Sequence, residues 1–270
     1  MALMMILDEG EQRMQEKEAE IPQSRGIYLL PNLFTTAALF AGFYAVVSAM
    51  KGQFDVAAIA VFVAMVADTL DGRIARLTNT QTAFGAEYDS LSDMVAFAVA
   101  PALIIYSWSL SGLGKIGWLA AFVYTAGTAL RLARFNTQSA DTDKRYFQGL
   151  PCPAAAAVLA ASVWLGEYYH IPGSVVAIPI ALVAVMLAAF MVSTIRYHSF
   201  KKVDLKGKVP FFVLLISVSC IVGVAIDPPQ VLFIIFFGYA FSGPILTLWQ
   251  LRKMRAQQKS RRHHHEKNSA

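Results

Sequence analysis

The chain has 270 residues, of which 56% are hydrophobic and only 15% charged, and its mean hydropathy is +0.50. Soluble domains carry about a quarter charged residues. These charges are too few to cover a water-exposed surface, which excludes a disordered chain and a small soluble protein. Because the hydrophobic residues gather in long runs, we predict an all-α protein that crosses a membrane several times.

The net charge of +5 comes from short basic segments between the apolar runs. No basic surface with interleaved aromatic residues is apparent, so we predict anionic membrane lipids as a partner and no nucleic acid. Cys152 and Cys220 are too few for a disulfide framework or a cysteine-rich zinc site, and their apolar surroundings predict two buried side chains. The run His263 to His265 belongs to a basic tail, where a solvated segment is favoured over a metal site.

The first 25 residues are rich in Glu and contain no apolar core before a cleavage site, so we predict a polar cytoplasmic arm and no signal peptide. Eight apolar runs follow, each close to the roughly 20 residues that a membrane-spanning helix needs. Pro, Gly and Lys residues separate these runs. We therefore predict a bundle of about eight transmembrane helices, at 31–50, 54–77, 84–108, 113–135, 152–170, 174–195, 209–226 and 229–250.

The basic residues predict the orientation of this bundle. If residue 1 lies in the cytoplasm, 21 of the 23 Lys and Arg residues fall on the cytoplasmic side, and only Lys51 and Lys115 fall on the other. The positive-inside rule then places both termini in the cytoplasm. The predicted organisation is a cytoplasmic arm (1–25), a membrane domain (26–200), additional C-terminal transmembrane helices (201–251) and a basic cytoplasmic tail (252–270).

The second and third apolar runs contain carboxylates, which are costly inside a membrane and indicate function. Residues three or four apart share one face of a helix. Two such stripes occur, one of Asp68, Asp71, Gly72 and Ala75, the other of Gly85, Asp89 and Asp93. The polar turn 78–83 predicts that the two helices run antiparallel, so four carboxylates converge near the cytoplasmic end of the pair.

Four like charges in a poorly solvated site require cations or protons. Carboxylate ligands suit hard divalent ions such as Mg²⁺ or Mn²⁺. Gly72, Ala75 and Gly85 leave room beside such ions for a flat group or a phosphate. The alternative is a proton relay, or buried salt bridges with Arg73 and Arg76, but neither requires small residues at those positions.

Residues 68–93 have the pattern Asp-x2-Asp-Gly-x2-Ala-Arg-x8-Gly-x3-Asp-x3-Asp. In this pattern the chain resembles the CDP-alcohol phosphotransferases. The resemblance implies an enzyme that cleaves a CDP-linked substrate, transfers the phosphoryl-bearing moiety to an alcohol and releases CMP. It also implies a divalent metal, Mg²⁺ or Mn²⁺, held by Asp68, Asp71 and Asp89, with Asp93 as the general base and a further metal ligand.

The same resemblance implies a binding site for the CDP-linked donor. Its residues would be Asn32, Thr35, Gly72, Ala75, Arg76 and Gly85. By local sequence alone, Asn32 and Thr35 are most simply the cap of the first helix, with Pro31 near its start.

The acceptor alcohol is indicated by other segments. Residues 30–35, 77–80, 131–136 and 146–153, within a likeness that covers 28–165, resemble the bacterial phosphatidylserine synthases of the integral-membrane type. The resemblance implies CDP-diacylglycerol and L-serine as substrates, a homodimer, and a multi-pass protein of the inner (cytoplasmic) membrane whose active site faces the cytoplasm. A guanidinium group is a natural partner for the serine carboxylate, so we predict Arg131 and Arg134 as serine-binding residues.

Several alternatives stay open. The two arginines can instead anchor the helix among lipid headgroups. Asn136 and the loop 147–153 either shape the serine pocket or serve as a helix cap and a connector. The acceptor can be glycerol 3-phosphate or inositol. From a different class of protein, the chain can be a cation or proton transporter, although it has no internal repeat of the kind found in transporters with duplicated halves.

Overall fold

The computed structural model describes residues 25–137, 146–198 and 211–268, so most of the predicted N-terminal arm lies outside it. Its helices are α2 (Arg25–Met50), α3 (Phe54–Leu77), α4 (Ala83–Asp93), α5 (Ala100–Trp108), α6 (Lys115–Thr137), α7 (Cys152–Tyr168), α8 (Ala177–Val192), α9 (Phe211–Ile226) and α10 (Pro228–Asn268). Shorter helical segments are the π-helical η1 (Met94–Val99) and the 3₁₀ turns η2 (Leu110–Leu113) and η3 (Gly173–Val176). Strands β1 (Tyr146–Gln148) and β2 (Arg196–His198) pair antiparallel.

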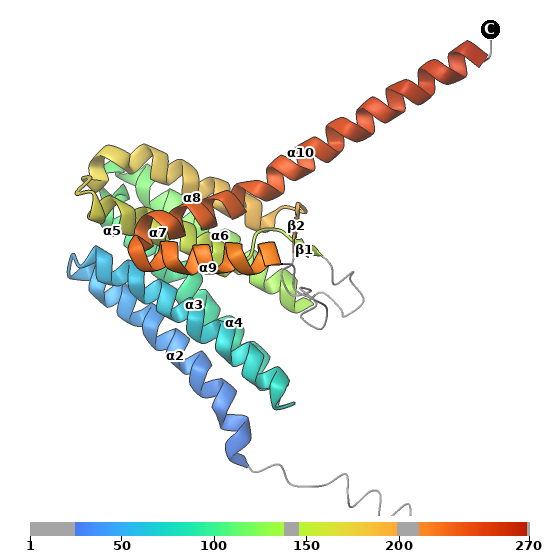
Figure 1. Ribbon diagram of the computed structural model, residues 1–270. Helices are drawn as coiled ribbons and strands as arrows, with labels where there is room; N and C mark the ends of the chain where they lie inside the picture. Colours follow the sequence, from blue (N-terminus) through green and yellow to red (C-terminus); the bar gives the residue numbers. More distant parts are fainter. Residues whose placement is uncertain (1–24, 138–145, 199–210, 269–270) are drawn as a thin grey trace, which may run out of the picture.

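The predicted helical fold is confirmed, and a helix occurs at each predicted position (Figure 1). The first helix begins at Arg25 and not at residue 31, so the prediction that Asn32 and Thr35 cap it was wrong: both lie inside α2. Within the described residues, five helices are long and apolar enough to cross a membrane: Leu29–Met50, Ala83–Trp108, Lys115–Thr137, Gly173–Val192 and Pro228–Thr247. Helix α3 carries five charged residues, and α7 has only 17 residues. The number of crossings and the side on which the termini lie stay predictions.

Small residues allow the central helices to pack closely. Helix α2 packs along α3 and also contacts α4, η1 and α5. Alanines such as Ala45, Ala57 and Ala64 are fully buried in this core. A Cβ atom on Gly42 would lie 2.6 Å from the Cα atom of Ala96, so α2 approaches η1 at backbone distance. The close approach brings the side chains at the start of α2 next to those of α3 and α4.

The helix predicted over 84–108 is continuous but not uniform, because η1 follows directly after Asp93. Pro101 has no N–H group with which to bond the carbonyl of Phe97 four residues earlier. The Tyr124 hydroxyl of α6 donates to this carbonyl instead, at 2.9 Å, and Tyr124 is fully buried. A neighbouring helix therefore stabilises the π-helical segment η1.

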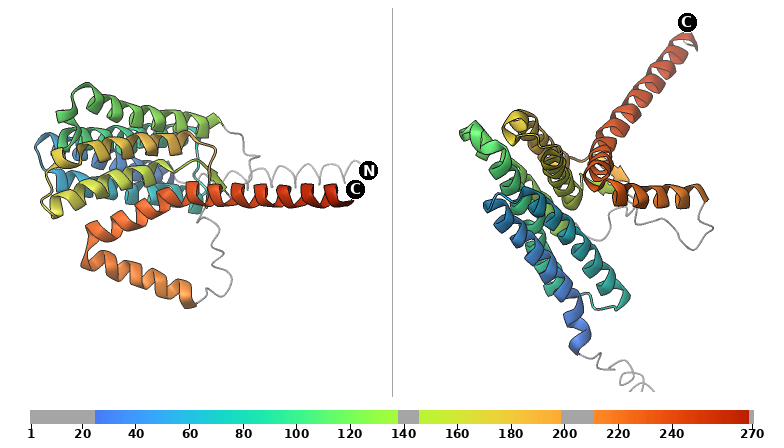
Figure 2. Two further views of the ribbon diagram at one scale, coloured as in Figure 1. Left: turned by 90° about the horizontal axis from the view of Figure 1, so that it is seen from above. Right: turned by 60° about the vertical axis from the view of Figure 1, so that its left-hand side comes forward.

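Helix α9 and the C-terminal part of α10 extend away from the main bundle (Figure 2). Helix α10 packs on α7, and α9 packs on α10. The buried Tyr197 of β2 donates its hydroxyl to the carbonyl of Ala240 at 2.9 Å, which fixes α10 to the bundle. Helix α10 continues past the predicted end of its span at residue 250 to Asn268, so the described part of the predicted basic tail is helical.

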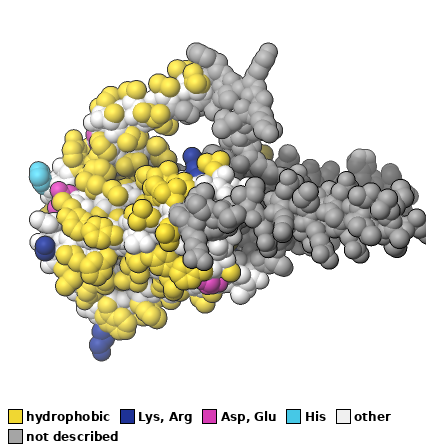
Figure 3. All heavy atoms as spheres, turned by 90° about the horizontal axis from the view of Figure 1, so that it is seen from below, with side chains coloured by type: hydrophobic (Ala, Val, Ile, Leu, Met, Phe, Trp, Pro, Cys, Tyr) yellow, Lys and Arg dark blue, Asp and Glu magenta, His cyan; other side chains and the backbone are white. Residues whose placement is uncertain are grey.

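The described surface is mainly hydrophobic. Figure 3 shows hydrophobic side chains over most of the face that it describes, with few charged groups. One prediction was wrong: Cys152 is buried as expected, but Cys220 on α9 is exposed. The reason is that Cys220 borders a hollow between α9 and α10, so the packing of these two helices leaves its side chain exposed.

Candidate active site

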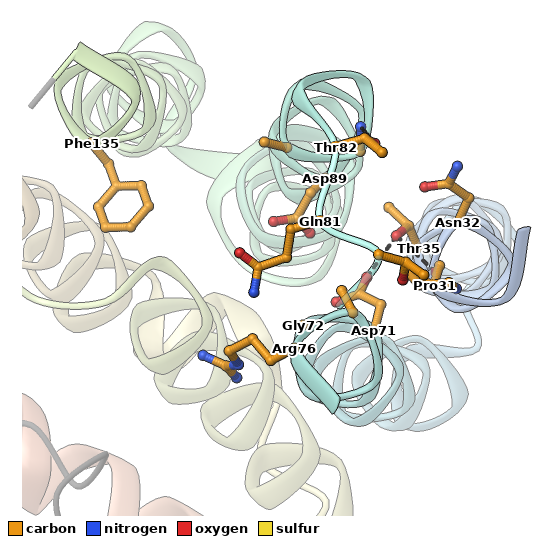
Figure 4. A pocket seen from close by; sticks show the side chains of 14 residues that line it. Pro31, Asn32, Thr35, Asp71, Gly72, Arg76, Gln81, Thr82, Asp89 and Phe135 are labelled. Carbon is orange, nitrogen blue, oxygen red and sulfur yellow. Dashed lines mark hydrogen bonds between the residues drawn. The ribbon is translucent and has the colours of Figure 1, made fainter. Parts of the chain in front are cut away.

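A cavity of about 360 Å³ opens where α2 begins, α3 ends and α4 begins. Figure 4 shows Asp71 of α3 and Asp89 of α4 directed toward this space, with Phe135 of α6 on its far side. The residues that line the cavity are Pro31, Asn32, Thr35, Asp71, Gly72, Ala75, Arg76, Thr80, Gln81, Thr82, Gly85, Ala86, Asp89 and Phe135.

Three carboxylates form an acidic cluster beside this cavity. Asp68, Asp71 and Asp89 each offer an oxygen atom within 4.8 Å of the other two. Asp71 is buried, with 5% of the residue exposed, whereas Asp68 and Asp89 are half-buried. Helix α3 supplies two of these groups and α4 supplies the third, so the cluster exists only when the two helices are correctly placed.

Asp93 lies one helical turn after Asp89, at the end of α4. Its carboxyl group is within hydrogen-bonding reach of that of Asp68 and is close enough to Asp71 and Asp89 to interact with their charges. The four carboxylates therefore converge, although Asp93 lies beside the three-oxygen cluster and is not a member of it.

The cluster fits a hard divalent cation. Mg²⁺ and Mn²⁺ are bound by oxygen atoms, and Mg²⁺ commonly uses one or two carboxylates together with substrate phosphates. The charges that act on Asp89 include those of Asp71 and Asp68, and such crowding favours bound cations. The cavity next to the cluster has room for the remaining ligands.

Two glycines keep this space open. A Cβ atom on Gly72 would meet only the Nη2 atom of Arg76, at 3.9 Å, so this position faces the cavity and not a packed neighbour. A Cβ atom on Gly85 would lie 3.1 Å from Thr82 Oγ1 and 3.5 Å from Asn32 Oδ1. Side chains at these positions would fill the space beside the carboxylates.

All six residues predicted to bind the donor line the cavity. Thr35 differs from the others because its hydroxyl donates to Asp71 Oδ2 at 2.8 Å and also contacts the carbonyl of Pro31 at 3.2 Å. The Ser92 hydroxyl donates to the carbonyl of Thr35 at 3.0 Å. Thr35 therefore connects α2 to the acidic cluster.

Some residues that line the cavity were not predicted from the sequence. Thr82 caps α4 by accepting a hydrogen bond from the backbone N–H of Gly85 at 3.0 Å. A threonine at the start of a helix is a typical N-cap, so this residue could have been found. Gln81 and Phe135 carry no such signal.

Neither of the arginines predicted to bind serine lines this cavity. Arg131 is buried and donates from Nη1 to Cys152 Sγ at 3.2 Å. Arg134 donates to carbonyls at the end of α8, at 2.9 Å for Val192 and 3.4 Å for Ser193. Serine binding by either residue stays a prediction.

Asn136 hydrogen-bonds to Ser90, with Nδ2 donating to Oγ at 3.0 Å. Ser90 directly follows Asp89, so this bond joins the end of α6 to the part of α4 that carries the acidic cluster. The contact gives Asn136 a structural role, and it does not test whether the residue also shapes a serine pocket.

Residues 28–187 match the family model described as CDP-alcohol phosphatidyltransferase. Among similar proteins, a CDP-diacylglycerol--serine O-phosphatidyltransferase of Helicobacter pylori is 38% identical over 84% of this chain and 94% of its own length. An enzyme of the same name from Mycobacterium tuberculosis is 30% identical over 80% of this chain and 77% of its own length. An archaetidylserine synthase of Methanothermobacter thermautotrophicus is 31% identical over 62% of this chain and 69% of its own length.

Proposed function

The chain belongs to the CDP-alcohol phosphatidyltransferase family, and from this premise we propose that it transfers the phosphatidyl group of CDP-diacylglycerol to L-serine. The products are phosphatidylserine and CMP. The observation that supports the reaction type is the convergence of Asp68, Asp71, Asp89 and Asp93 beside a cavity that two glycines keep open. The names of the relatives support serine as the acceptor.

Asp68, Asp71 and Asp89 would hold a divalent cation, Mg²⁺ or Mn²⁺, and Asp93 would be a further ligand. When bound, the cation withdraws charge from the phosphoryl oxygens and offsets the negative charge that develops on CMP. Thr35 keeps the Asp71 carboxylate in place through its hydrogen bond. Asn32, Thr35, Gly72, Ala75, Arg76 and Gly85 surround the donor, with Arg76 supplying positive charge at the wall of the cavity.

Asp93 acts as the general base. It accepts the proton of the serine hydroxyl, and the serine oxygen forms a bond to the phosphorus that carries diacylglycerol. The bond between this phosphorus and the oxygen of CMP breaks in the same displacement. Arg131 and Arg134 are the proposed partners of the serine carboxylate, and the burial of Arg131 favours it for this role.

The protein would work at the cytoplasmic face of the inner membrane. The long apolar helices support a membrane location, and the position of 21 of the 23 Lys and Arg residues supports a cytoplasmic orientation for both termini and for the cavity. Lipid tails would then stay in the bilayer while serine and CMP exchange with water. The family resemblance supports a homodimer, and the basic segments support binding of anionic lipids.

The proposed function is tested with purified protein in detergent micelles that contain CDP-diacylglycerol. Isotope-labelled L-serine should appear in phosphatidylserine, with one CMP released for each lipid formed. Glycerol 3-phosphate and inositol, offered in place of serine, should give little product. CMP release without an alcohol, or a preference for one of these other acceptors, would contradict the assignment, and ion flux without CMP release would indicate a transporter.

The metal is tested in the same assay. An excess of chelator should abolish turnover, and Mg²⁺ or Mn²⁺ should restore it, because four carboxylates beside a diphosphate require compensating charge. D71N should be inactive at every metal concentration or require more metal. D55N is the matched control, because Asp55 is an exposed carboxylate at the opposite end of the same helix. Full turnover in excess chelator would rule out the metal site.

A further inference from the structure

Arg131 of α6 is a buried cation with incomplete hydrogen bonding. Only 9% of the residue is exposed, and its Nη1 atom donates to the thiol of Cys152 at 3.2 Å. Its Nε atom is buried and has no hydrogen-bond partner in the described structure. A thiol is a weak acceptor, and a buried charge without an anion is costly. The arrangement therefore indicates that an anion binds here during function.

Cys152 connects this cation to the proposed general base. It is the first residue of α7, it is fully buried, and its thiol interacts electrostatically with both Arg131 and Asp93. L-Serine carries its hydroxyl and its carboxylate only a few bonds apart. A serine molecule whose hydroxyl meets Asp93 would direct its carboxylate toward the guanidinium beside Cys152.

The loop that precedes Cys152 is fixed by the end of α8 and the segment that follows it. Gly149 has a positive φ of 78° and donates its backbone N–H to the carbonyl of Ile195 at 2.9 Å. The N–H of Leu150 donates to the carbonyl of Phe190 at 3.1 Å. Arg134 binds carbonyls of the same helix end. The thiol at the start of α7 therefore has a defined position and can orient Arg131.

Helix α10 also carries a residue that interacts with the same guanidinium. Arg131 interacts electrostatically with the hydroxyl of Tyr239. The Tyr239 ring packs on the buried ring of Tyr197, with 5.8 Å between their centroids. Tyr197 also holds the backbone of α10 at Ala240. A helix outside the family-matched residues 28–187 thus reaches a residue inside them.

We propose that Cys152 and Tyr239 are positioning residues that hold the Arg131 guanidinium for the acceptor's carboxylate, so that helix α10 completes the acceptor site. The proposal rests on the proposed function, since it takes serine as the acceptor. It assigns the preference for a carboxylate-bearing alcohol to three residues on three helices, α6, α7 and α10. Loss of either partner should loosen Arg131 and weaken serine binding while donor binding is unchanged.

The test measures steady-state constants for serine and for CDP-diacylglycerol in C152A, C152S, Y239F and R131A. C152A and Y239F should each raise the KM for serine by roughly two- to tenfold, because each removes one weak contact of the Arg131 guanidinium, and leave the KM for the donor unchanged. C152S retains a hydroxyl acceptor and should restore most of the serine affinity. In the R131A background, C152A should have no further effect on the KM for serine, because its effect acts through Arg131.

Two controls separate positioning from damage to the fold. C220A removes the exposed cysteine of α9, and Y44F removes the hydroxyl of an exposed tyrosine of α2; both should leave all constants unchanged. A normal KM for serine in C152A and Y239F, or additive effects of C152A and R131A, would overturn the inference. If wild-type protein makes no lipid from serine, the proposed function itself fails, so the two failures are distinguishable.

Discussion

The carboxylate of Asp71 depends on a residue from a different helix. It is the most buried group of the acidic cluster, and it accepts a hydrogen bond from Thr35 of α2. Hydrogen bonds to charged groups contribute about 1.5–3 kcal/mol, more than those between neutral groups. The orientation of one predicted metal ligand is thus determined by a side chain that carries no charge.

T35V retains the shape of Thr35 but removes the hydroxyl that donates to Asp71. We expect the metal concentration for half-maximal activity to rise roughly ten- to hundredfold, which corresponds to the loss of a hydrogen bond to a charged group. T35S should retain most of the metal affinity because it keeps the hydroxyl. Metal titrations of turnover, and direct Mn²⁺ binding by the purified protein, measure the effect.

The matched control for this prediction is T69V. The Thr69 hydroxyl donates to the carbonyl of Met65 on its own helix and lies on an exposed part of α3. Its removal should leave the metal dependence unchanged. Equal metal requirements for T35V and wild type would mean that Asp71 does not need the contact with α2.

D93N separates the general base from the metal ligands. An amide keeps the shape of the side chain but cannot accept the serine proton, so kcat should fall by roughly 10² or more while CDP-diacylglycerol still binds. D68N should weaken metal-dependent donor binding as well as the rate. Single-turnover rates and donor binding are measured separately for each variant. Near-normal turnover of D93N would mean that Asp93 is not the general base, and Asp89 would be the next candidate.

Among the elements, the helical segment η1 between α4 and α5 is stabilised by a side chain of α6. The π-helical η1 follows directly after Asp93, and π-bulges frequently occur at functional sites. The carbonyl of Phe97 cannot bond to Pro101, and the Tyr124 hydroxyl takes the place of the missing N–H. A hydrogen bond from another helix therefore stabilises the π-helical segment that connects the acidic end of α4 to α5.

Y124F removes this donor and leaves a buried carbonyl unsatisfied. The free energy of unfolding should fall by about 1–3 kcal/mol, the cost of a buried polar group without a partner. Thermal unfolding in detergent measures this change. Y44F, on the exposed face of α2, is the control and should unfold at the wild-type temperature. Equal stability of Y124F and wild type would mean that the Phe97 carbonyl finds another donor.

For the whole molecule, the orientation in the membrane can be tested at both ends of the bundle. Helices α3 and α6 end where the cavity opens, and they begin near Lys51 and Lys115, the two basic residues predicted to face outward. Basic residues concentrate on the cytoplasmic side of a membrane, so the cavity should face the cytoplasm.

Single cysteines introduced into a C220A background report this orientation. S139C, in the segment after α6, should react with an impermeant thiol reagent only after the cells are permeabilised. G112C, an exposed position between α5 and α6, should react in intact cells. The background protein is the control for reaction of the buried Cys152. Labelling of S139C in intact cells would reverse the proposed topology.

The sequence was most informative where periodicity and chemistry coincide. The spacing of the aspartates on two helices separated by a polar turn sufficed to predict that four carboxylates converge. Helix positions followed from the length of the apolar runs. Hydrogen bonds between distant residues, such as those of Thr35 with Asp71 and Tyr124 with Phe97, leave no periodic signal, so they required the structure.

The exposure of Cys220 could not be predicted from the sequence for a similar reason. Apolar neighbours in sequence do not distinguish the core of a bundle from its outer face, because in a membrane both are hydrophobic. The arginines Arg131 and Arg134 looked equivalent in sequence, whereas the structure gives one a thiol partner inside the bundle and the other carbonyl partners at a helix end.

The order of the residues along the chain has an evolutionary consequence. The cavity and its carboxylates draw on residues 31–93, apart from Phe135, whereas Arg131, Cys152 and Tyr239 are spread over more than a hundred later positions. If Arg131, Cys152 and Tyr239 form the acceptor site as proposed, mutations in the later part of the gene change which alcohol is accepted without altering the segment that carries the aspartates. One ancestral gene segment can then be inherited almost unchanged, while the descendant enzymes acquire specificity for different headgroup alcohols.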